Sequence, residues 1–383
     1  MPETISITAI ESISPLGYNR GQIWQNYLKP VHHFSQFGET DSVAAYLDVS
    51  SKKRIEALKS EPHFKNVDDS VLYAVAASRL AVASAGWEKG DLFGINIGSS
   101  RGATKLFEDN HKDFIASGTA RTLSSPTTTL GNISSWVAHD LQSQGPEISH
   151  SITCSTALHA LLNGIAWLRA GMSNKFLVGG SEAPLTDFTL AQMKALKIYS
   201  TSKDEFPSKT LHLDKTQNSM ILGEGASVCC LEIGTPENAI AEISGFGYAT
   251  EMLQHSISIS TEADCFQKSM KMALEGTDSN SVDVIVMHAP GTIKGDRSEV
   301  NAIQKIFAGN LPLLTTNKWK IGHTFGASGM LSVEMAIMMM QNQMFIGVPN
   351  VSRTQPAKIQ KVLINSVGFG GNAVSILLTL PKK

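Results

Sequence analysis

Short apolar runs alternate with longer stretches of helical periodicity along most of the chain, and this alternation limits the possible folds more than any other feature. Residues 69–86 repeat apolar side chains at helical spacing, whereas residues 92–98 and 175–180 form short apolar runs between turn residues. Runs of this kind are typical of strands buried on both faces, and the helices between them can cover those faces. The sequence therefore predicts an α/β fold with a central sheet and crossover helices.

The length and the internal order of the chain indicate two similar halves. With 383 residues, the chain exceeds the size at which one hydrophobic core keeps growing. A turn-rich break at residues 234–238 follows an apolar run, and a second series of strands and helices begins after it. A helix at about residues 258–276 and a strand at residues 282–287 repeat the order of helix and strand found before Gly98. We therefore predict two halves, residues 1–234 and residues 235–383.

The overall charge excludes two classes of partner. Because 32 lysines and arginines stand against 34 aspartates and glutamates, the net charge is -2, which provides no basic field for a nucleic-acid backbone or an anionic membrane. No window approaches the ~18 apolar residues of a membrane span, and residues 1–10 lack the basic region and apolar run of a signal peptide. We expect a cytoplasmic protein that binds neither nucleic acid nor membrane.

One of the four cysteines has a position suited to chemistry. Cys229 and Cys230 belong to an apolar run and are expected to be small core residues, and no cysteines or histidines have metal-ligand spacing, so no metal site is predicted. Cys154 lies between a short strand-like run and a long apolar helix. There the helix dipole and unpaired backbone N–H groups would favour a thiolate and could hold an oxyanion. A lone cysteine is more often a buried structural residue, so its surroundings decide.

Two histidines are the other candidates for a reactive site. His288 follows the apolar run 284–287 and begins a loop that contains glycine and proline. His323 precedes Gly326 and Gly329, which open a helix and allow close approach to another backbone. Each histidine could be structural on its own, and the case for catalysis depends on the motifs around it.

Four segments together resemble β-ketoacyl-acyl-carrier-protein synthases of classes I and II. The region from residue 130 through Cys154 resembles their nucleophile region, and residues 318–329 match their motif Lys-x-x-x-Gly-His-x-x-Gly-Ala-x-Gly. Residues 288–299 fit the pattern His-Gly-Thr-x-Thr-Pro-x-Gly-Asp-x-x-Glu without a gap, and residues 368–371 match Gly-Phe-Gly-Gly. The resemblance covers the chain from about Gly94 to Leu380.

The chain departs from this family at a few positions. Ala289, Pro290 and Ile293 differ from the His-Gly-Thr pattern, and residues 217–220 replace the usual Arg-x-Gly-Phe. A rival alignment on the tripeptide that begins at Pro290 would put proline in the place of the first histidine and make the chain inactive, but it needs a two-residue deletion. We prefer the ungapped alignment, and the departures leave the acyl-chain length, the primer and the pathway open.

The resemblance implies a thiolase-like fold with five α-β-α-β-α layers, two similar halves and a dimeric assembly. It also implies an acyltransferase of the 3-oxoacyl-[acyl-carrier-protein] synthase type. In this reaction an acyl thioester forms on Cys154 and then undergoes decarboxylative Claisen condensation with malonyl-acyl-carrier protein. Neutral His288 and His323 would donate N–H groups to the enolate oxygen, which stabilises the carbanion equivalent without a proton that could quench it.

The resemblance assigns supporting roles to five further positions. The N–H of Phe369 joins that of Cys154 as the oxyanion hole, while the Phe369 ring screens the acyl pocket. Thr292 could hydrogen-bond the pantetheine amides. Lys318 and Glu299 would orient the histidines and tune their protonation, with an ordinary internal ion pair as the alternative, and Asp296 belongs to the same supporting motif.

The implied partners follow from the reaction. The enzyme itself would bind no cofactor, because the substrate is carried on the phosphopantetheine of acyl carrier protein. Lys52, Lys53, Arg54 and Lys65 are candidates for a basic rim that meets this acidic protein, although a solvated surface cluster explains them as well. We expect a homodimer, or a heterodimer with a related ketosynthase subunit.

Three competing functions are distinguished by specific residues. A thiolase needs a second reactive cysteine late in the chain, but the last cysteine is Cys265. Class III synthases have asparagine in place of the second histidine, which His323 contradicts. A non-catalytic chain-length-factor-like subunit, which dimerises with an active ketosynthase, usually lacks the cysteine that this chain retains as Cys154. Fatty-acid synthesis and a specialised polyketide or aryl-polyene pathway both remain open.

Overall fold

The computed structural model describes residues 3–130, 132–252, 259–351 and 355–381. Its strands are β1 (Ile5–Ile13), β2 (Ser35–Gln36), β3 (Val43–Ala44), β4 (Gly94–Gly98), β5 (Glu147–Ile148), β6 (Lys175–Glu182), β7 (Gly225–Ile233), β8 (Ala241–Thr250), β9 (Val284–Val286), β10 (Leu313–Thr315), β11 (Lys361–Gly368) and β12 (Asn372–Thr379).

The α-helices are α1 (Arg20–Leu28), α2 (Val49–Ser60), α3 (Asp69–Ala85), α4 (Thr104–Ser117), α5 (Ser124–Thr128), α6 (Asn132–Leu141), α7 (Thr156–Arg169), α8 (Asp187–Ala195), α9 (Asp264–Ala273), α10 (Ile293–Phe307), α11 (Lys318–Ile321) and α12 (Ser328–Asn342). Short 3-10 turns span Pro62–Phe64, Ser279–Ser281 and Phe325–Ala327. No helix in these described ranges is long and apolar enough to cross a membrane.

The main sheet consists of two five-stranded units with the same internal pattern. The order β1-β7-β6-β4-β5 in one unit corresponds to β8-β12-β11-β9-β10 in the other. In each unit the first two pairings are antiparallel and the last two are parallel. A short antiparallel pairing of β1 with β8 joins the units, through Ser6 with Glu242 and Ile7 with Ala241. This repeat confirms the prediction of two similar halves.

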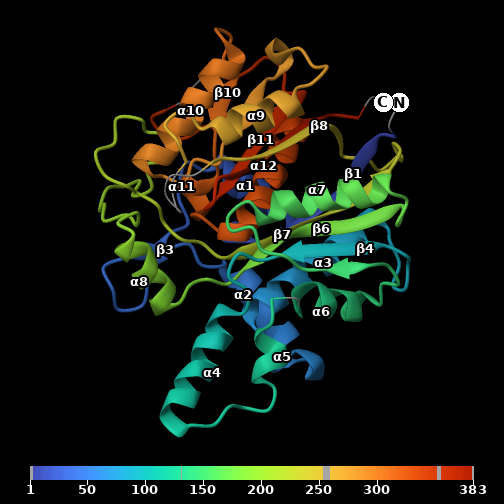
Figure 1. The fold of residues 1–383 in the computed structure, drawn as a ribbon, viewed down its shortest axis with the longest axis vertical. Coiled ribbons are helices and arrows are strands. Elements are labelled where there is room, and N and C mark those ends of the chain that lie inside the picture. The colour runs from blue at the N-terminus through green and yellow to red at the C-terminus, as the bar shows by residue number, and fades with distance from the viewer. Residues whose placement is uncertain (1–2, 131, 253–258, 352–354, 382–383) are drawn as a thin grey trace.

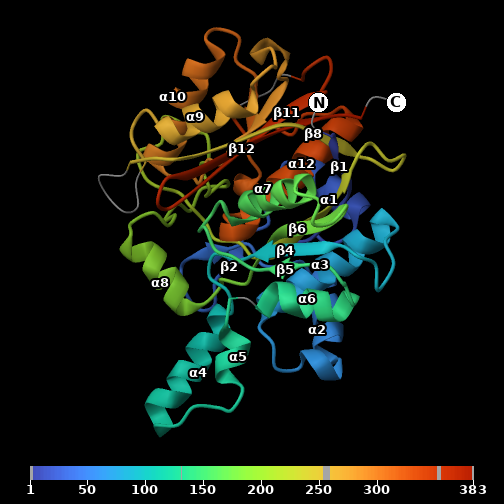
Figure 2. The same cartoon turned by 45° about the vertical axis from the view of Figure 1, so that its right-hand side comes forward.

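Helices cover both faces of both units, which produces five layers. Figures 1 and 2 show α7 and α12 between the two sheet units, with α3 and α6 outside one unit and α9 and α10 outside the other. Helix α7 packs on β6 and β4, α12 packs on β11 and β7, and the two helices touch each other. The α-β-α-β-α order is therefore the predicted one.

Helix α12 of the central layer is buried on every side because it packs against strands of both sheet units. All side chains from Ser328 through Met340 of α12 are buried, and five of them are methionines, whose flexible side chains fill irregular gaps. Cys229 and Cys230 are fully buried in β7, as the core interpretation of that run predicted. A tightly packed centre holds the loops at the strand ends in fixed positions.

Two sequence-based boundaries differ from the structure. The helix expected at residues 258–276 is the shorter α9, and residues 253–258 lie outside the described part of the chain. The strand expected at residues 282–287 is the shorter β9, and the N–H of Val282 closes the preceding 3-10 turn by donating to the carbonyl of Ser279. The predicted division at residue 234 falls between β7 and β8 and stays a prediction.

Candidate active site

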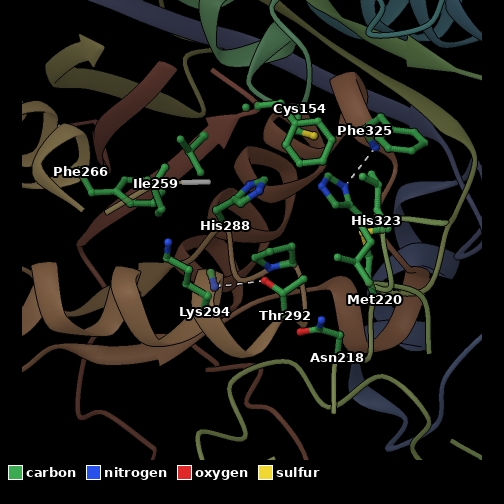
Figure 3. A pocket seen from close by; sticks show the side chains of 17 residues that line it. Cys154, Asn218, Met220, Ile259, Phe266, His288, Thr292, Lys294, His323 and Phe325 are labelled. Atoms are coloured by element: carbon green, nitrogen blue, oxygen red, sulfur yellow. Dashed lines mark hydrogen bonds between the residues drawn. The ribbon is translucent and has the colours of Figure 1, made fainter. Parts of the chain in front are cut away.

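Three candidate residues from distant parts of the sequence line one cavity of about 220 Å³. Cys154 precedes α7, His288 follows β9, and His323 follows α11. All three are at least 95% buried, with exposed fractions of 5%, 5% and 3%. Figure 3 shows the Cys154 sulfur and the two imidazoles facing a common space.

Cys154 occupies a turn immediately before α7. The N–H of Ser155 donates to the carbonyl of Ile152 at 3.2 Å, and α7 begins at Thr156. The backbone N–H groups of Cys154 and Phe369 both favour the charged form of the sulfur. The expectation of a readily formed thiolate is nevertheless wrong, because burial, followed by the nearby Glu182 carboxylate, raises the pKa of the Cys154 thiol to about 12.

The turn between β11 and β12 is fitted closely against the cysteine loop. A Cβ on Gly368 would lie 1.8 Å from Oγ1 of Thr153, so only glycine allows this approach. The Thr153 hydroxyl donates to the carbonyl of Phe369 at 3.3 Å, and the Ser366 hydroxyl donates to the carbonyl of Cys154 at 3.2 Å. These contacts bring the Phe369 N–H to the sulfur, where the sequence interpretation placed an oxyanion hole.

The tautomer of His323 is set by its own loop. The N–H of Phe325 donates to Nδ1 of His323 at 3.1 Å, and Oγ of Ser328 lies 2.9 Å from the same nitrogen. A nitrogen that accepts a backbone N–H carries no proton, so the neutral ring holds its proton on Nε2. Burial, followed by the charge of Lys318, lowers the pKa of His323 well below its ordinary value. His323 is thus a neutral hydrogen-bond donor.

His288 lies across the cavity from His323. The ring centroids are 5.2 Å apart and the rings are nearly perpendicular, at 80°. Burial is the main cause that lowers the pKa of His288 well below its ordinary value, with smaller contributions from Lys318 and His323. His288 is therefore the group beside His323, as the ungapped alignment predicts, although Pro290 also lines the cavity.

Glu299 fixes the backbone of His288. Its two carboxylate oxygens accept the N–H groups of His288 at 3.0 Å and Ala289 at 2.9 Å, and Asn365 donates to it at 3.2 Å. Burial raises the pKa of Glu299 to about 7. Lys318 makes no ion pair within 4.0 Å among the described residues, so the direct pair with Glu299 that was the alternative is not formed.

The remaining supporting residues lie around this core. Lys318 is buried, which lowers its pKa to about 8, while Glu299, Cys154 and Asp296 favour its charged form. Asp296 pairs with buried Lys215 at 2.6 Å and accepts the N–H of Gly291 at 2.9 Å, so it holds the loop after His288 instead of touching either imidazole. The Thr292 oxygen accepts the N–H of Gly295 at 3.1 Å, which caps α10, and Thr292 also lines the cavity.

The basic residues proposed for the rim do not line the cavity. Lys52 lies over the Tyr46 ring at 5.0 Å and Arg54 lies over the Tyr18 ring at 5.0 Å, both on or beside α2. The cation at the cavity is instead Lys294, in the first turn of α10. These positions are compatible with a solvated surface cluster, which was the favoured interpretation of residues 52–54.

Sequence reasoning gave no role to Glu182, which links two loops of the site. One of its oxygens accepts the N–H of Gly326 at 3.0 Å and also the N–H of Ser100. Its second oxygen is buried without a partner among the described residues, and burial raises the pKa of Glu182 to about 7. The sequence did contain a signal for Glu182, because it is a carboxylate at the end of an apolar, strand-like run. The ends of strands in one sheet meet at the same edge, where site residues gather.

Two family models match this chain in succession. Residues 2–235 match the N-terminal domain of β-ketoacyl synthases and residues 240–352 match the C-terminal domain. The chain belongs to the β-ketoacyl synthase family. Its class is that of the acyltransferase-type condensing enzymes, which confirms the sequence prediction at the level of the family.

Relatives and solved structures extend over the whole β-ketoacyl synthase chain. A "3-oxoacyl-[acyl-carrier-protein] synthase 2" from Coxiella burnetii is 27% identical and the match covers 98% of both chains. A solved structure described as the ishigamide ketosynthase/chain length factor has a TM-score of 0.86 at 21% identity, and one of a ketosynthase in complex with its acyl-carrier protein has 0.86 at 18% identity. Both cover 100% of each chain, so the fold is the predicted thiolase-like one.

Proposed function

We propose that this chain catalyses the decarboxylative condensation of an acyl group, held as a thioester on Cys154, with a malonyl group on acyl carrier protein. The observation that carries the proposal is the single cavity shared by a cysteine with two backbone N–H groups at its sulfur and by two neutral imidazoles. A nucleophile beside an oxyanion site and a pair of neutral donors is the set that acyl transfer followed by enolate chemistry needs.

In the first step the Cys154 sulfur attacks the acyl thioester carbon. The N–H groups of Cys154 and Phe369 bind the oxygen that becomes negative, the carrier's carbon–sulfur bond breaks, and the thiol proton of Cys154 passes to the leaving sulfur. Because burial raises the pKa of the free thiol, the proton leaves as attack proceeds and no standing thiolate is required. The products are the acyl-enzyme and the free carrier thiol.

In the second step the malonyl carboxylate is lost as carbon dioxide. The electron pair of the broken carbon–carbon bond forms an enolate on the thioester, whose oxygen accepts hydrogen bonds from His288 and His323. The enolate carbon attacks the acyl carbon on Cys154, the carbon–sulfur bond breaks, and the sulfur leaves as a thiolate that takes a proton from solvent to restore the thiol. Both histidines must stay neutral here, which agrees with the lowering of their pKa values by burial.

The direct test uses the purified chain and two carrier thioesters. Incubation with an acyl-acyl-carrier protein is expected to add one acyl mass, and peptide mapping should locate it on Cys154. Malonyl-acyl-carrier protein should then remove that mass and yield a β-ketoacyl product. A chain that is never acylated, but changes product length when mixed with an active ketosynthase, would instead be the non-catalytic chain-length-factor-like subunit.

We propose acyl carrier protein and a second ketosynthase-family subunit as the partners. The surface around α4 favours a protein neighbour, because Phe107, Phe114 and Ile115 are 59%, 47% and 71% exposed, and Figures 1 and 2 show α4 and α5 projecting from the body. Strand β5 is an edge of the main sheet in the described part of the chain, and its Ile148 is exposed. Two copies, or this chain and a related ketosynthase, could cover both features.

Light scattering during size exclusion measures this assembly. We expect the mass of a dimer at micromolar concentration, and a charged substitution at Ile115 should shift the mass toward that of one chain. A matched substitution at Met252, which is 98% exposed and lies outside α4 and α5, should leave the mass unchanged. A monomer for the unaltered chain alone would point to a heterodimer, and a monomer even in the presence of a related ketosynthase would contradict the proposal.

A further inference from the structure

Phe325 forms one wall of the cavity around Cys154. Its ring centroid lies 5.5 Å from that of His323, and Figure 3 shows the two side chains next to each other. Its φ of 40° lies in the left-handed region, which a bulky residue adopts only where the surrounding structure requires it. The fold thus holds an aromatic ring at this wall at some conformational cost.

The guanidinium of Arg101 lies against Phe325, and its central carbon is 5.8 Å from the ring centroid. One terminal nitrogen donates to Oε1 of Gln192 at 2.6 Å, while Nε is buried without a hydrogen-bond partner among the described residues. Arg101 forms no ion pair within 4.0 Å in the same part of the chain. Most of its five N–H donors are therefore available to a ligand.

A second cavity of about 800 Å³ begins at Arg101. Its lining combines apolar rings from Phe107 and Phe188 with the basic groups of Arg101, His111 and Lys112. The single carboxylate in the lining, Glu108, already accepts a hydrogen bond from the Thr186 hydroxyl at 2.9 Å. This cavity therefore has apolar walls and an excess of cationic groups, which suits a chain with an anionic end.

Glu182 accepts hydrogen bonds from both loops that lie between the two cavities. The same oxygen accepts the N–H of Ser100, next to Arg101, and the N–H of Gly326, next to Phe325. A Cβ on Gly326 would lie 2.7 Å from both this oxygen and the nitrogen of Ser100, so the two loops are in close contact. The partition between the cavities thus consists of Phe325 and Arg101, held by one carboxylate.

We propose that the space beyond Phe325 is a specificity subsite, and that the acyl group carried by Cys154 ends in a carboxylate that binds Arg101. This inference rests on the proposed function, since it concerns the acyl group of that reaction. The reaction cavity, at about 220 Å³, is smaller than the roughly 300–1,000 Å³ of sites for drug-sized ligands, so a longer acyl chain must pass its wall. A methyl end would leave the buried Nε of Arg101 without a partner, whereas a carboxylate pairs with the guanidinium in two-pronged geometry.

The test compares two acyl groups of equal carbon count, octanoyl and its ω-carboxyl counterpart suberoyl. Each is linked to pantetheine through an unreactive amide, and binding is measured by calorimetry. We expect the native protein to bind the suberoyl amide at least about tenfold more tightly than the octanoyl amide. Arg101→Leu should abolish or reverse this ratio, and Arg101→Lys should retain part of it.

Arg169→Leu is the matched control. Arg169 also lies over an aromatic ring, that of Phe246 at 4.9 Å, but it is exposed on α7 and lines neither cavity. Its variant should keep the native ratio and the native melting temperature. Equal affinities in the native protein, or a ratio that survives Arg101→Leu, would overturn the subsite. The amides cannot acylate Cys154, so their binding ratio is independent of the reaction. If the native protein shows the expected ratio but is never acylated by the carrier thioester, the proposed function is contradicted and the subsite is supported.

Discussion

Replacement of Cys154 by alanine is expected to abolish acyl transfer while malonyl decarboxylation continues. The alanine variant lacks the atom that carries the acyl group, so condensation should fall by at least about a thousandfold. The groups that stabilise the enolate, His288 and His323, are positioned by Glu299 and by Phe325, and none of these contacts involves the sulfur. Carbon dioxide release from malonyl-acyl-carrier protein should therefore persist, with acetyl-acyl-carrier protein as the product.

Intact-mass measurement of the enzyme and of the carrier separates these two activities. Cys229→Ala is the matched control, because Cys229 is also a fully buried cysteine, in β7, and lines no part of the reaction cavity. It should acylate and condense as the native chain does. Two results would contradict the assignment of acyl transfer to the sulfur and of decarboxylation to the imidazoles. One is an acyl mass that persists in Cys154→Ala, and the other is the loss of decarboxylation in a Cys154→Ala protein that melts at the native temperature.

The sequence predicted those features of the fold and the site that depend on local patterns of apolar, glycine and turn residues. Cys154, His288 and His323 each stand where an apolar run or a glycine-rich loop meets the end of an element, and strand ends of a shared sheet gather at one edge. The similarity of the two halves was visible as a repeated order of helix and strand, although only the pairing pattern of the sheet establishes it. The local pattern also overestimated the length of β9, because the N–H of Val282 belongs to the 3-10 turn before the strand.

The features that sequence did not predict depend on contacts between distant residues. Glu182 joins Ser100, 82 positions earlier, to Gly326, 144 positions later, and no local pattern specifies that meeting. Asp296 finds its partner Lys215 at a separation of 81 residues. The ionisation of Cys154 was misjudged for the same reason, since the helix end is a local feature whereas the burial that opposes it is produced by the whole fold.

Replacement of His288 or His323 by alanine is expected to have the converse effect to the loss of the cysteine. Cys154 should still accept an acyl group, because the N–H groups at its sulfur belong to the backbone of Cys154 and Phe369. Decarboxylation should fall by about a hundredfold to a thousandfold, which is the usual effect of removing one donor to a developing negative oxygen. His323→Gln, whose amide retains an N–H donor, should recover part of the rate. Equal losses of acylation and decarboxylation would contradict separate roles.

The pH dependence of decarboxylation tests the charge state of these donors. An ordinary histidine gains a proton as the pH falls through about 6.5. Burial lowers the pKa of both His288 and His323 well below this value, so each imidazole gains its proton at a more acidic pH than an ordinary histidine does. The rate in the native chain should therefore show no acid limb centred near pH 6.5 when carbon dioxide release is followed between about pH 6 and 8. An acid limb at that pH in the native chain that disappears in His323→Ala would show that this imidazole titrates, and the enolate would then need a different source of neutral hydrogen bonds.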